Sequence, residues 1–270
     1  MSNDPLAIIF VSNGPGELAT WVQPLAQELH RQVALRPKVL SSSISLNLVL
    51  VPCPNGTGYE DVVAKKWMQF EKIIKAKSFW KLVLKPNEFG SWPSKGVVIF
   101  LGGDQFWSVL LSARLGYLHM TYAEWIVRWP LWNDRILAMS DKILHKLPKR
   151  IQERCSVIGD LTADLIETAK IDNPLPSGKW IALLPGSKSA KLKIGIPFFL
   201  DVADRISKLM PDTNFLIPLA PTTNIEEIKY FSSSKNPITR QYKSGIKSII
   251  KTSNKDQRLI LTTKNSTVIL

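Results

Sequence analysis

The stretch Ala7-Ile-Ile-Phe-Val11-Ser12-Asn-Gly-Pro-Gly-Glu17 decides the fold. Its first five residues form a short apolar run that is rich in branched side chains, which predicts a buried strand. From Glu17 to Arg31 the apolar residues recur at helical spacing, which predicts a helix with one apolar face. A strand that passes through a glycine-containing loop into a helix is typical of an α/β sheet covered by helices.

The same order of strand, loop and helix recurs along the chain. Further strands are predicted at residues 46–51, 97–101, 117–122, 135–139, 156–158, 180–184, 215–219 and 259–261. Helices are predicted at residues 105–114, 161–169, 198–210 and 225–231. This alternation predicts an α/β protein with helices on both faces of the sheet.

A break in the pattern divides the chain. Pro174, Pro176 and Gly178 fall between a predicted helix and a new buried strand, as expected of a linker. After Lys179 the strand, glycine loop and helix order starts again. We therefore expect two Rossmann-like domains, residues 1–172 and residues 179–270, joined by a linker at residues 173–178.

Composition excludes several classes of protein. The 270 residues are 45% hydrophobic and 21% charged, with a mean hydropathy of +0.01, which excludes a disordered or collagen-like chain. The formal net charge of +13 favours anionic partners. No nucleic-acid motif accompanies the charge, so we expect no nucleic-acid partner. Two cysteines and three histidines show no metal-ligand spacing, so no metal site is expected.

The N-terminus carries no secretory or membrane-spanning signal. The apolar run at residues 6–11 is too short for either, which predicts a cytoplasmic protein. Seven of the nine tryptophans are interleaved with lysines between residues 65 and 132. Such a pattern suits a membrane interface, an anionic one included, and equally an ordinary core. Residues 65–80 are predicted to form an amphipathic helix packed on the sheet.

The first loop is a candidate ligand-binding loop. Ser12, Gly14, Gly16 and Glu17 stand at the carboxyl end of a predicted strand, where open α/β sheets bind ligands. The alternative is a tight turn in which Glu17 only stabilises the first helical turn. A dinucleotide fingerprint needs a glycine where Ala19 stands, and no acid follows about 20 residues later. A Rossmann oxidoreductase is therefore disfavoured.

Two further loops carry candidate residues. Asp104 follows the strand at residues 97–101, where a carboxylate could act as a base or hold a hydroxyl, or could simply cap the next helix. Gly186, Ser187 and Lys188 follow the first strand of the second domain. Backbone N–H groups, a hydroxyl and an ammonium can together bind a diphosphate, and a solvated loop is the alternative.

Taken together, these segments resemble the lipid-A-disaccharide synthase family of glycosyltransferases, which have the GT-B architecture of two Rossmann-like domains. The resemblance rests on the first loop, on residues 98–104, on Val157-Ile-Gly-Asp-Leu-Thr-Ala-Asp164 and, most specifically, on Ile181-Ala-Leu-Leu-Pro-Gly-Ser-Lys188. It spans residues 6 to about 222. The family usually has arginine where Lys188 stands, and a histidine where this chain has Asp160.

The resemblance implies inverting transfer of a hexosyl group from a UDP-sugar to a lipid or hydrophobic acceptor, with no metal or other cofactor. Asp104 would then be the catalytic carboxylate. Ser12, Gly14, Gly16 and Glu17 would bind the acceptor substrate. Gly186, Ser187 and Lys188 would bind the nucleotide sugar.

The family's donor-binding segment lies later in the second domain than this sequence extends. We therefore expect the second domain to be incomplete, and two functions stay open. The chain is either a hexosyltransferase or a non-catalytic binding module of the same fold.

Overall fold

The chain folds into two compact units, Met1–Leu165 and Ile166–Leu270, and each is described by itself. The computed structural model describes residues 5–35, 44–54, 56–67, 69–163, 178–219, 223–232, 238–240, 246–251 and 258–262. Residues 173–177 of the predicted linker and Asp164, the last residue of the segment Val157–Asp164, lie outside these ranges. Among the described residues, none of the helices combines the length and apolarity needed to cross a bilayer.

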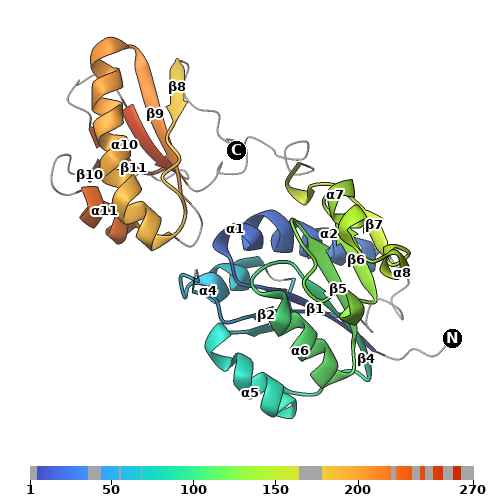
Figure 1. The fold of residues 1–270 in the computed structure, drawn as a ribbon. Coiled ribbons are helices and arrows are strands. Elements are labelled where there is room, and N and C mark those ends of the chain that lie inside the picture. Colours follow the sequence, from blue (N-terminus) through green and yellow to red (C-terminus); the bar gives the residue numbers. More distant parts are fainter. Residues whose placement is uncertain are drawn as a thin grey trace. The chain divides into compact units, whose positions relative to one another are not determined.

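The first unit is built on a sheet of seven parallel strands in the order β3-β2-β1-β4-β5-β6-β7 (Figure 1). The strands are β1 (Leu6–Ser12), β2 (Ile44–Leu50), β3 (Lys72–Ile74), β4 (Lys95–Phe100), β5 (Leu118–Ala123), β6 (Arg135–Ala138) and β7 (Cys155–Val157). Chain order reverses beside β1, because β2 lies on one side of it and β4 on the other. Such a switch point leaves a crevice at the carboxyl ends of the two strands.

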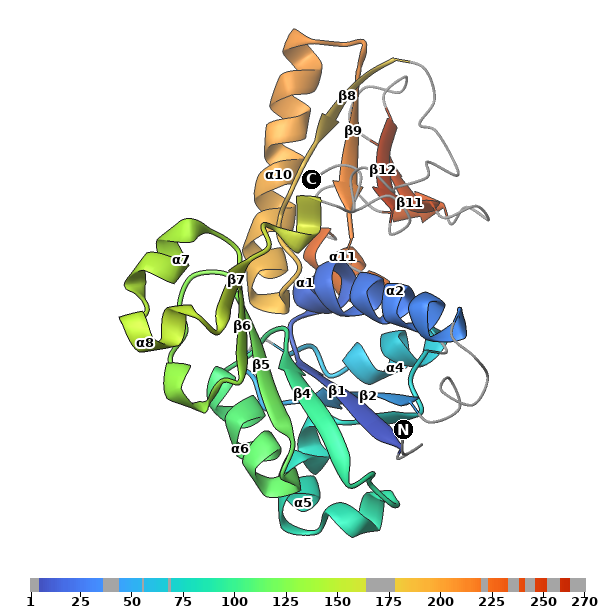
Figure 2. The same cartoon turned by 90° about the vertical axis from the view of Figure 1, so that its right-hand side faces the viewer.

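Helices cover both faces of this sheet, as Figure 2 shows. They are α1 (Pro15–Glu17), α2 (Gln23–Ala34), α4 (Glu60–Ala64), α5 (Phe79–Leu84), α6 (Gln105–Leu115), α7 (Asp141–Lys146) and α8 (Lys149–Gln152). A π-helical segment, Leu18–Val22, joins α1 to α2, and 3-10 turns lie at Lys65–Trp67, Ala76–Ser78, Pro86–Phe89 and Pro130–Trp132.

Strand β1 is buried on both faces. Ala7, Ile9 and Val11 pack in the core beneath α5 and α6. Ile8 and Phe10 pack in the opposite core, with residues of the π-helical segment and α2. Burial on both faces explains why this strand is a continuous apolar run rather than an alternating one.

One sequence prediction for the first unit is wrong. Residues 65–80 do not form an amphipathic helix, because they contain the edge strand β3 between two 3-10 turns. Strand β3 pairs in parallel with β2, and Ile74 is buried in the core. The branched pair Ile73 and Ile74 favours this strand over a helix.

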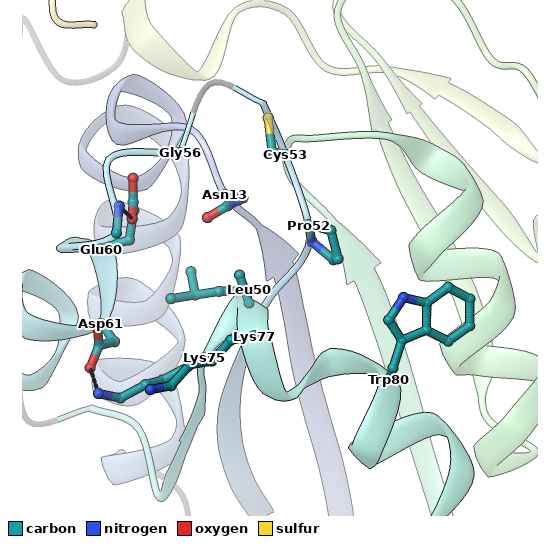
Figure 3. Close-up of a pocket in the computed structure, with 12 residues that line it drawn as sticks. Asn13, Leu50, Pro52, Cys53, Gly56, Glu60, Asp61, Lys75, Lys77 and Trp80 are labelled. Carbon is teal, nitrogen blue, oxygen red and sulfur yellow. Dashed lines mark hydrogen bonds and ion pairs between the residues drawn. The ribbon is translucent and has the colours of Figure 1, made fainter. Parts of the chain in front are cut away.

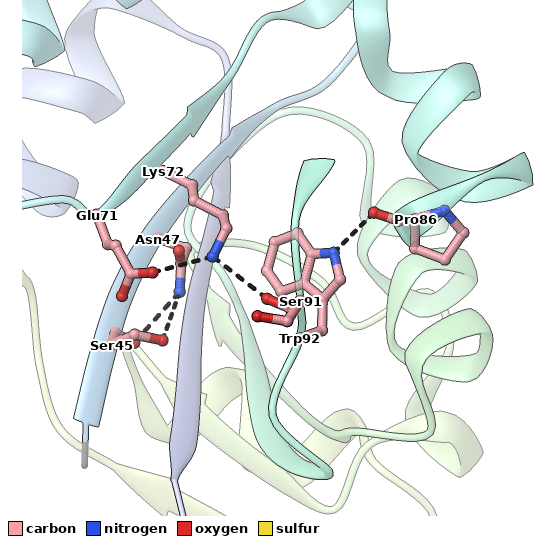
Figure 4. Close-up of polar contacts among 7 residues, drawn as sticks. All are labelled: Ser45, Asn47, Glu71, Lys72, Pro86, Ser91 and Trp92. Atoms are coloured by element: carbon pink, nitrogen blue, oxygen red, sulfur yellow. Dashed lines mark hydrogen bonds and ion pairs between the residues drawn. The ribbon is translucent and has the colours of Figure 1, made fainter. Parts of the chain in front are cut away.

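Figure 4 shows how the region of this edge strand is held. Lys72 Nζ lies 3.0 Å from Glu71 Oε1 and 5.1 Å from the centre of the Trp92 ring. The Trp92 indole donates a hydrogen bond to the Pro86 carbonyl. This lysine–tryptophan pair therefore stabilises the fold. It agrees with the alternative that the tryptophans interleaved with lysines belong to an ordinary core.

The second unit has a five-stranded sheet in the order β10-β11-β12-β9-β8, in which β8, β9 and β12 are parallel. Its strands are β8 (Lys179–Ala182), β9 (Thr213–Pro218), β10 (Ile238–Arg240), β11 (Ile246–Lys251) and β12 (Arg258–Thr262), and its helices are α10 (Ser189–Leu209) and α11 (Ile225–Ser232). Helix α10 begins nine residues earlier than predicted, although Pro197 lies inside it. Leu192, Ile196 and Leu200 recur on its buried face, and this packing offsets the hydrogen bond that proline removes.

A buried histidine makes the first unit sensitive to acid. His119 on β5 is 2% exposed, and its Nε2 lies 2.9 Å from Ser108 Oγ. Burial lowers the pKa of His119 to about 4, partly opposed by the Trp132 backbone and the charge of Asp134. In the unfolded chain His119 has the ordinary histidine pKa of 6.5, whereas in the folded chain it is protonated only near pH 4. The unfolded chain therefore binds more protons than the folded chain between these two pH values.

We expect the free energy of unfolding to fall between about pH 6.5 and pH 4, with His119 contributing up to about 3 kcal/mol of that loss. Denaturant titrations at several pH values measure it. His119→Gln should flatten the slope over this range, whereas His145→Gln, at an exposed position, should keep the wild-type slope. An unchanged slope in His119→Gln would contradict the assignment.

Candidate functional site

The candidate site lies at the carboxyl edge of the first sheet, beside the switch point between β1 and β4. Ser12 is the last residue of β1, Gly14 lies in the loop that follows, and Glu17 is the last residue of the short helix α1. Ser12 and Gly14 are buried, and Glu17 is half-buried. The Glu17 carboxylate folds back against Gly14. It lies so close that a Cβ atom at position 14 would collide with both carboxylate oxygens. Gly16 is exposed in α1 and has no neighbour where a side chain would be.

The loop after β4 passes close to the first one. Gly102 has a φ of +155°, and a Cβ there would lie 2.9 Å from Ser12 Oγ and 3.0 Å from Glu17 Cβ. Ser12 Oγ has no hydrogen-bond partner among the described residues. The sheet therefore brings four predicted residues, Ser12, Gly14, Glu17 and Asp104, to two neighbouring loops.

Asp104 caps helix α6 and pairs with an arginine. Its Oδ1 accepts a hydrogen bond from Phe106 N at 3.0 Å, so the capping alternative that the sequence left open is observed. Its Oδ2 lies 3.2 Å from Arg128 Nη1. Because the Asp104 side chain is 45% exposed, this ion pair contributes little to stability. The carboxylate is still partly exposed to solvent at the carboxyl end of β4.

The glycine that precedes Asp104 supports this geometry. Gly103 has a φ of +91°, and a Cβ there would lie 2.9 Å from Val51 Cγ2. We expect Gly103→Ala to lower the free energy of unfolding by about 2 kcal/mol or more, from backbone strain and the contact with Val51. Gly16→Ala is the matched control, and it should be neutral or stabilise by up to about 1 kcal/mol. Equal stabilities of the two variants in urea titrations would contradict this reading.

Sequence reasoning missed Glu124. This half-buried carboxyl follows β5 directly, so it reaches the same edge as Asp104. Burial raises the pKa of Glu124, and the charges of Glu17 and Asp160 raise it further, whereas a hydrogen bond with Trp125 opposes them. An acid two residues after the strand predicted at residues 117–122 was the available signal. Within the described ranges, no three His, Cys, Asp or Glu side chains lie close enough together to hold a metal ion.

Sequence reasoning also missed a pocket of about 630 Å³ next to the first loop (Figure 3). Asn13 reaches it from the first loop, and Trp80 lines it from α5. Lys75 lies 3.0 Å from Asp61, and both line the pocket. Glu60 accepts hydrogen bonds from the backbone N–H groups of Thr57 and Gly58, which fixes the loop at the pocket rim.

Exposed aromatic rings lie on the same unit as Asp104. Phe106 and Trp129 are each 41% exposed, and Trp80 is 51% exposed. Trp107 connects them, with ring centres 5.2 Å from Phe106 and 5.4 Å from Trp80. We call Trp80, Phe106, Trp107 and Trp129 the aromatic surface. Clustered exposed rings of this kind are typical of interaction sites.

The second unit holds the other three predicted residues on one loop. Gly186, with a φ of +98°, turns the chain between β8 and α10. Ser187 and Lys188 are half-buried, and Lys188 is the N-terminal capping residue of α10. The loop lies after a parallel strand and before a 21-residue helix, which is a suitable place for an anion. The Ser189 hydroxyl donates to the Glu227 carboxylate.

Comparison with known structures identifies the architecture. A UDP complex of MnaA from S. aureus superposes with a TM-score of 0.55 at 12% identity, over 97% of this chain and 70% of that one. A UDP-GlcNAc 2-epimerase from Neisseria meningitidis, bound to UDP-GlcNAc, also gives a TM-score of 0.55 at 12% identity, over 98% of this chain and 74% of that one. The chain has a GT-B-like fold. The sequence prediction of two Rossmann-like domains is confirmed.

Sequence comparison supports the same GT-B-like assignment. A lipid-A-disaccharide synthase from Aeromonas hydrophila is 31% identical over 98 residues. That alignment covers 32% of this chain and 26% of the relative, so it spans about a quarter of the relative's length. No family model matches the chain.

Proposed function

We propose that this GT-B-like protein transfers a hexosyl group from a UDP-sugar to a lipid or otherwise hydrophobic acceptor, with inversion and without a metal or other cofactor. Two findings support a nucleotide-sugar donor. The partial sequence match is to a lipid-A-disaccharide synthase, and the two structural neighbours carry UDP or UDP-GlcNAc. Gly186, Ser187 and Lys188 would contact the donor diphosphate.

The placement of Asp104 is the observation that carries the proposal. It stands at the carboxyl end of β4 beside the switch point, with Ser12, Gly14 and Glu17 on the neighbouring loop. A carboxylate in this place can contact an acceptor hydroxyl, either as a base or as a hydrogen-bond acceptor. The aromatic surface includes Phe106, two residues after Asp104.

The aromatic surface supports a hydrophobic acceptor. The rings of Trp80, Phe106 and Trp129 are exposed, so the acyl or prenyl chain of an acceptor could lie across them while the acceptor's hydroxyl reaches the Asp104 carboxylate. Lys77 and Trp80 line the same pocket, so a cation shares this pocket with one ring of the aromatic surface. Tryptophan with lysine also favours contact with an anionic membrane surface, from which such an acceptor would be delivered.

Vesicle binding tests this part of the proposal. We expect the double variant Phe106→Ser, Trp129→Ser to bind vesicles of phosphatidylglycerol and phosphatidylcholine at least about tenfold more weakly, because two exposed rings no longer bury apolar area. Tyr230→Ser is the control, since Tyr230 is 76% exposed in the second unit. Sedimentation with vesicles measures the difference. If the double variant binds vesicles as strongly as the wild type, the aromatic surface does not contact the membrane.

Product analysis tests the transfer itself. The full chain is incubated with UDP-GlcNAc and vesicles of extracted bacterial lipid, and UDP release is followed while mass spectrometry searches for a hexosylated lipid. We expect UDP release that depends on the lipid. Saturable UDP-GlcNAc binding without any transfer would contradict the proposed transferase activity. The chain would then be the alternative, a non-catalytic binding module.

A further inference from the structure

The pocket beside Asn13 occupies its own part of the first sheet (Figure 3). Three strands that are neighbours in the order β3-β2-β1 supply it, since Lys75 follows β3, Leu50 ends β2 and Asn13 follows β1. Asp104 instead follows β4, on the other side of β1, and is not among the described residues that line the pocket. The volume of about 630 Å³ is typical of a site for a small organic molecule.

The two carboxylates that line this pocket already have partners. Glu60 is 3% exposed, and its oxygens accept three hydrogen bonds from residues 57–58. The Asp61 side chain is 6% exposed, and its Oδ2 lies 3.0 Å from Lys75 Nζ and 3.6 Å from Lys65 Nζ. Because both carboxylates are engaged within the protein, neither is left to bind a cationic ligand.

A lysine and an amide of the pocket remain without partners. Lys77 is exposed and makes no hydrogen bond or ion pair with another described residue. Asn13 is 2% exposed, and its side chain likewise makes no hydrogen bond with another described residue. Its Nδ2 lies at the edge formed by Gly56, where a Cβ atom would be only 3.0 Å away. A buried amide without a partner costs free energy, which a bound ligand would recover.

The charges around the pocket favour an anion. Three ammonium groups, those of Lys65, Lys75 and Lys77, accompany two carboxylates, which gives a local net charge of +1. Lys75 and Lys77 are two residues apart at the 3-10 turn after β3, so one phosphate group could contact both. An ammonium has three donors, and Asp61 takes only one of those of Lys75. Lysine is a common ligand of phosphate.

The remaining wall of the pocket is apolar. Leu50, Pro52 and Ala76 line it, and so does Trp80, whose ring is part of a side chain that is 51% exposed. Inorganic phosphate would leave these side chains in contact with water, whereas an organic group attached to the phosphate would cover them. The lining therefore suits a phosphate ester better than the bare ion.

We propose that this pocket binds an organic phosphate monoester. The phosphate would contact Lys77 and Lys75, the organic group would lie against Trp80, and Asn13 would donate a hydrogen bond to the ligand. This site goes beyond the proposed transfer of a hexosyl group. Neither Asp104 nor the loop at residues 186–188 contributes to it, so the site would exist even if the chain transferred no sugar.

Calorimetric titration of the full chain tests the proposal with phenyl phosphate, glucose 6-phosphate and inorganic phosphate. We expect at least one of the two monoesters to bind saturably, and about tenfold or more tighter than inorganic phosphate, because its organic group buries apolar surface. The comparison of the two monoesters distinguishes an aromatic from a hydroxyl-rich organic group. If neither monoester binds, or if inorganic phosphate binds as tightly as both, the proposal is wrong.

Lysine variants locate the bound phosphate. Lys77→Ala should weaken binding of the tighter monoester about tenfold or more, because a charge-assisted hydrogen bond is lost. Lys66→Ala is the matched control, since Lys66 is exposed on the same unit and is not among the described lining residues. Equal affinities of these two variants would overturn the assignment. So would loss of binding in Lys188→Ala rather than in Lys77→Ala, because the phosphate would then bind before α10.

Asn13→Asp tests the opposite wall of the same site. The substitution keeps the size of the side chain but places a negative charge in the pocket, so binding of the monoester should fall about tenfold or more. Wild-type affinity in this variant would contradict the proposal. A chain that binds the monoester but neither UDP-GlcNAc nor UDP would retain this site while the proposed function fails, and the reverse result would reject this site alone.

Discussion

Asp104→Asn should lower kcat/KM for the acceptor about 10- to 100-fold, which is the effect of removing one hydrogen bond to a charged group. The variant loses the negative charge but keeps an oxygen that can accept the Phe106 N–H. Because asparagine caps helices as well as aspartate does, the stability of α6 should hardly change. A loss of activity would then reflect the charge rather than folding.

Steady-state kinetics with varied acceptor and constant UDP-GlcNAc measures this effect. Asp141→Asn is a matched control, because Asp141 lies in the first turn of α7 on the same unit. It should retain wild-type kinetics. An Asp104→Asn enzyme within twofold of the wild type would show that Asp104 only caps its helix.

Lys188→Ala should weaken UDP binding about tenfold or more. The lysine stands at the start of α10, where backbone N–H groups and the helix dipole already favour an anion, and its ammonium would add one charge-assisted hydrogen bond. Lys188→Arg should bind UDP at least as well as the wild type, because a guanidinium can contact a diphosphate through two hydrogen bonds.

Lys193→Ala provides the control for this prediction. Lys193 is exposed on the same helix, so its removal changes the net charge equally without touching the loop. Calorimetric titration with UDP measures all three variants. Equal affinities of Lys188→Ala and Lys193→Ala would exclude Lys188 from the donor site.

The sequence predicted most of the two sheets because buried parallel strands are short apolar runs. Strands β1, β2 and β4 were recognisable for this reason, and so were the loops that follow β1 and β4. The short edge strand β3 was missed because a three-residue strand in a lysine-rich stretch resembles part of a helix. The start of α10 was missed because Pro197 is usually a helix boundary.

The candidate site was predicted only in part. Ser12, Gly14, Glu17 and Asp104 could be found because a glycine or an acid directly after a strand is a local signal. Glu124 gains its importance from Glu17 and Asp160, which are distant in sequence. The pocket beside Asn13 depends on residues from β2, α4 and α5, whose meeting no local pattern predicts.

Equilibrium binding of UDP-GlcNAc to the full chain tests the central claim most directly. We predict saturable binding that free UDP displaces, and that Lys188→Ala weakens while Asp104→Asn leaves it unchanged. A calorimetric titration that shows no binding of UDP-GlcNAc or UDP by the folded protein would contradict the claim that this GT-B-like chain is a nucleotide-sugar protein.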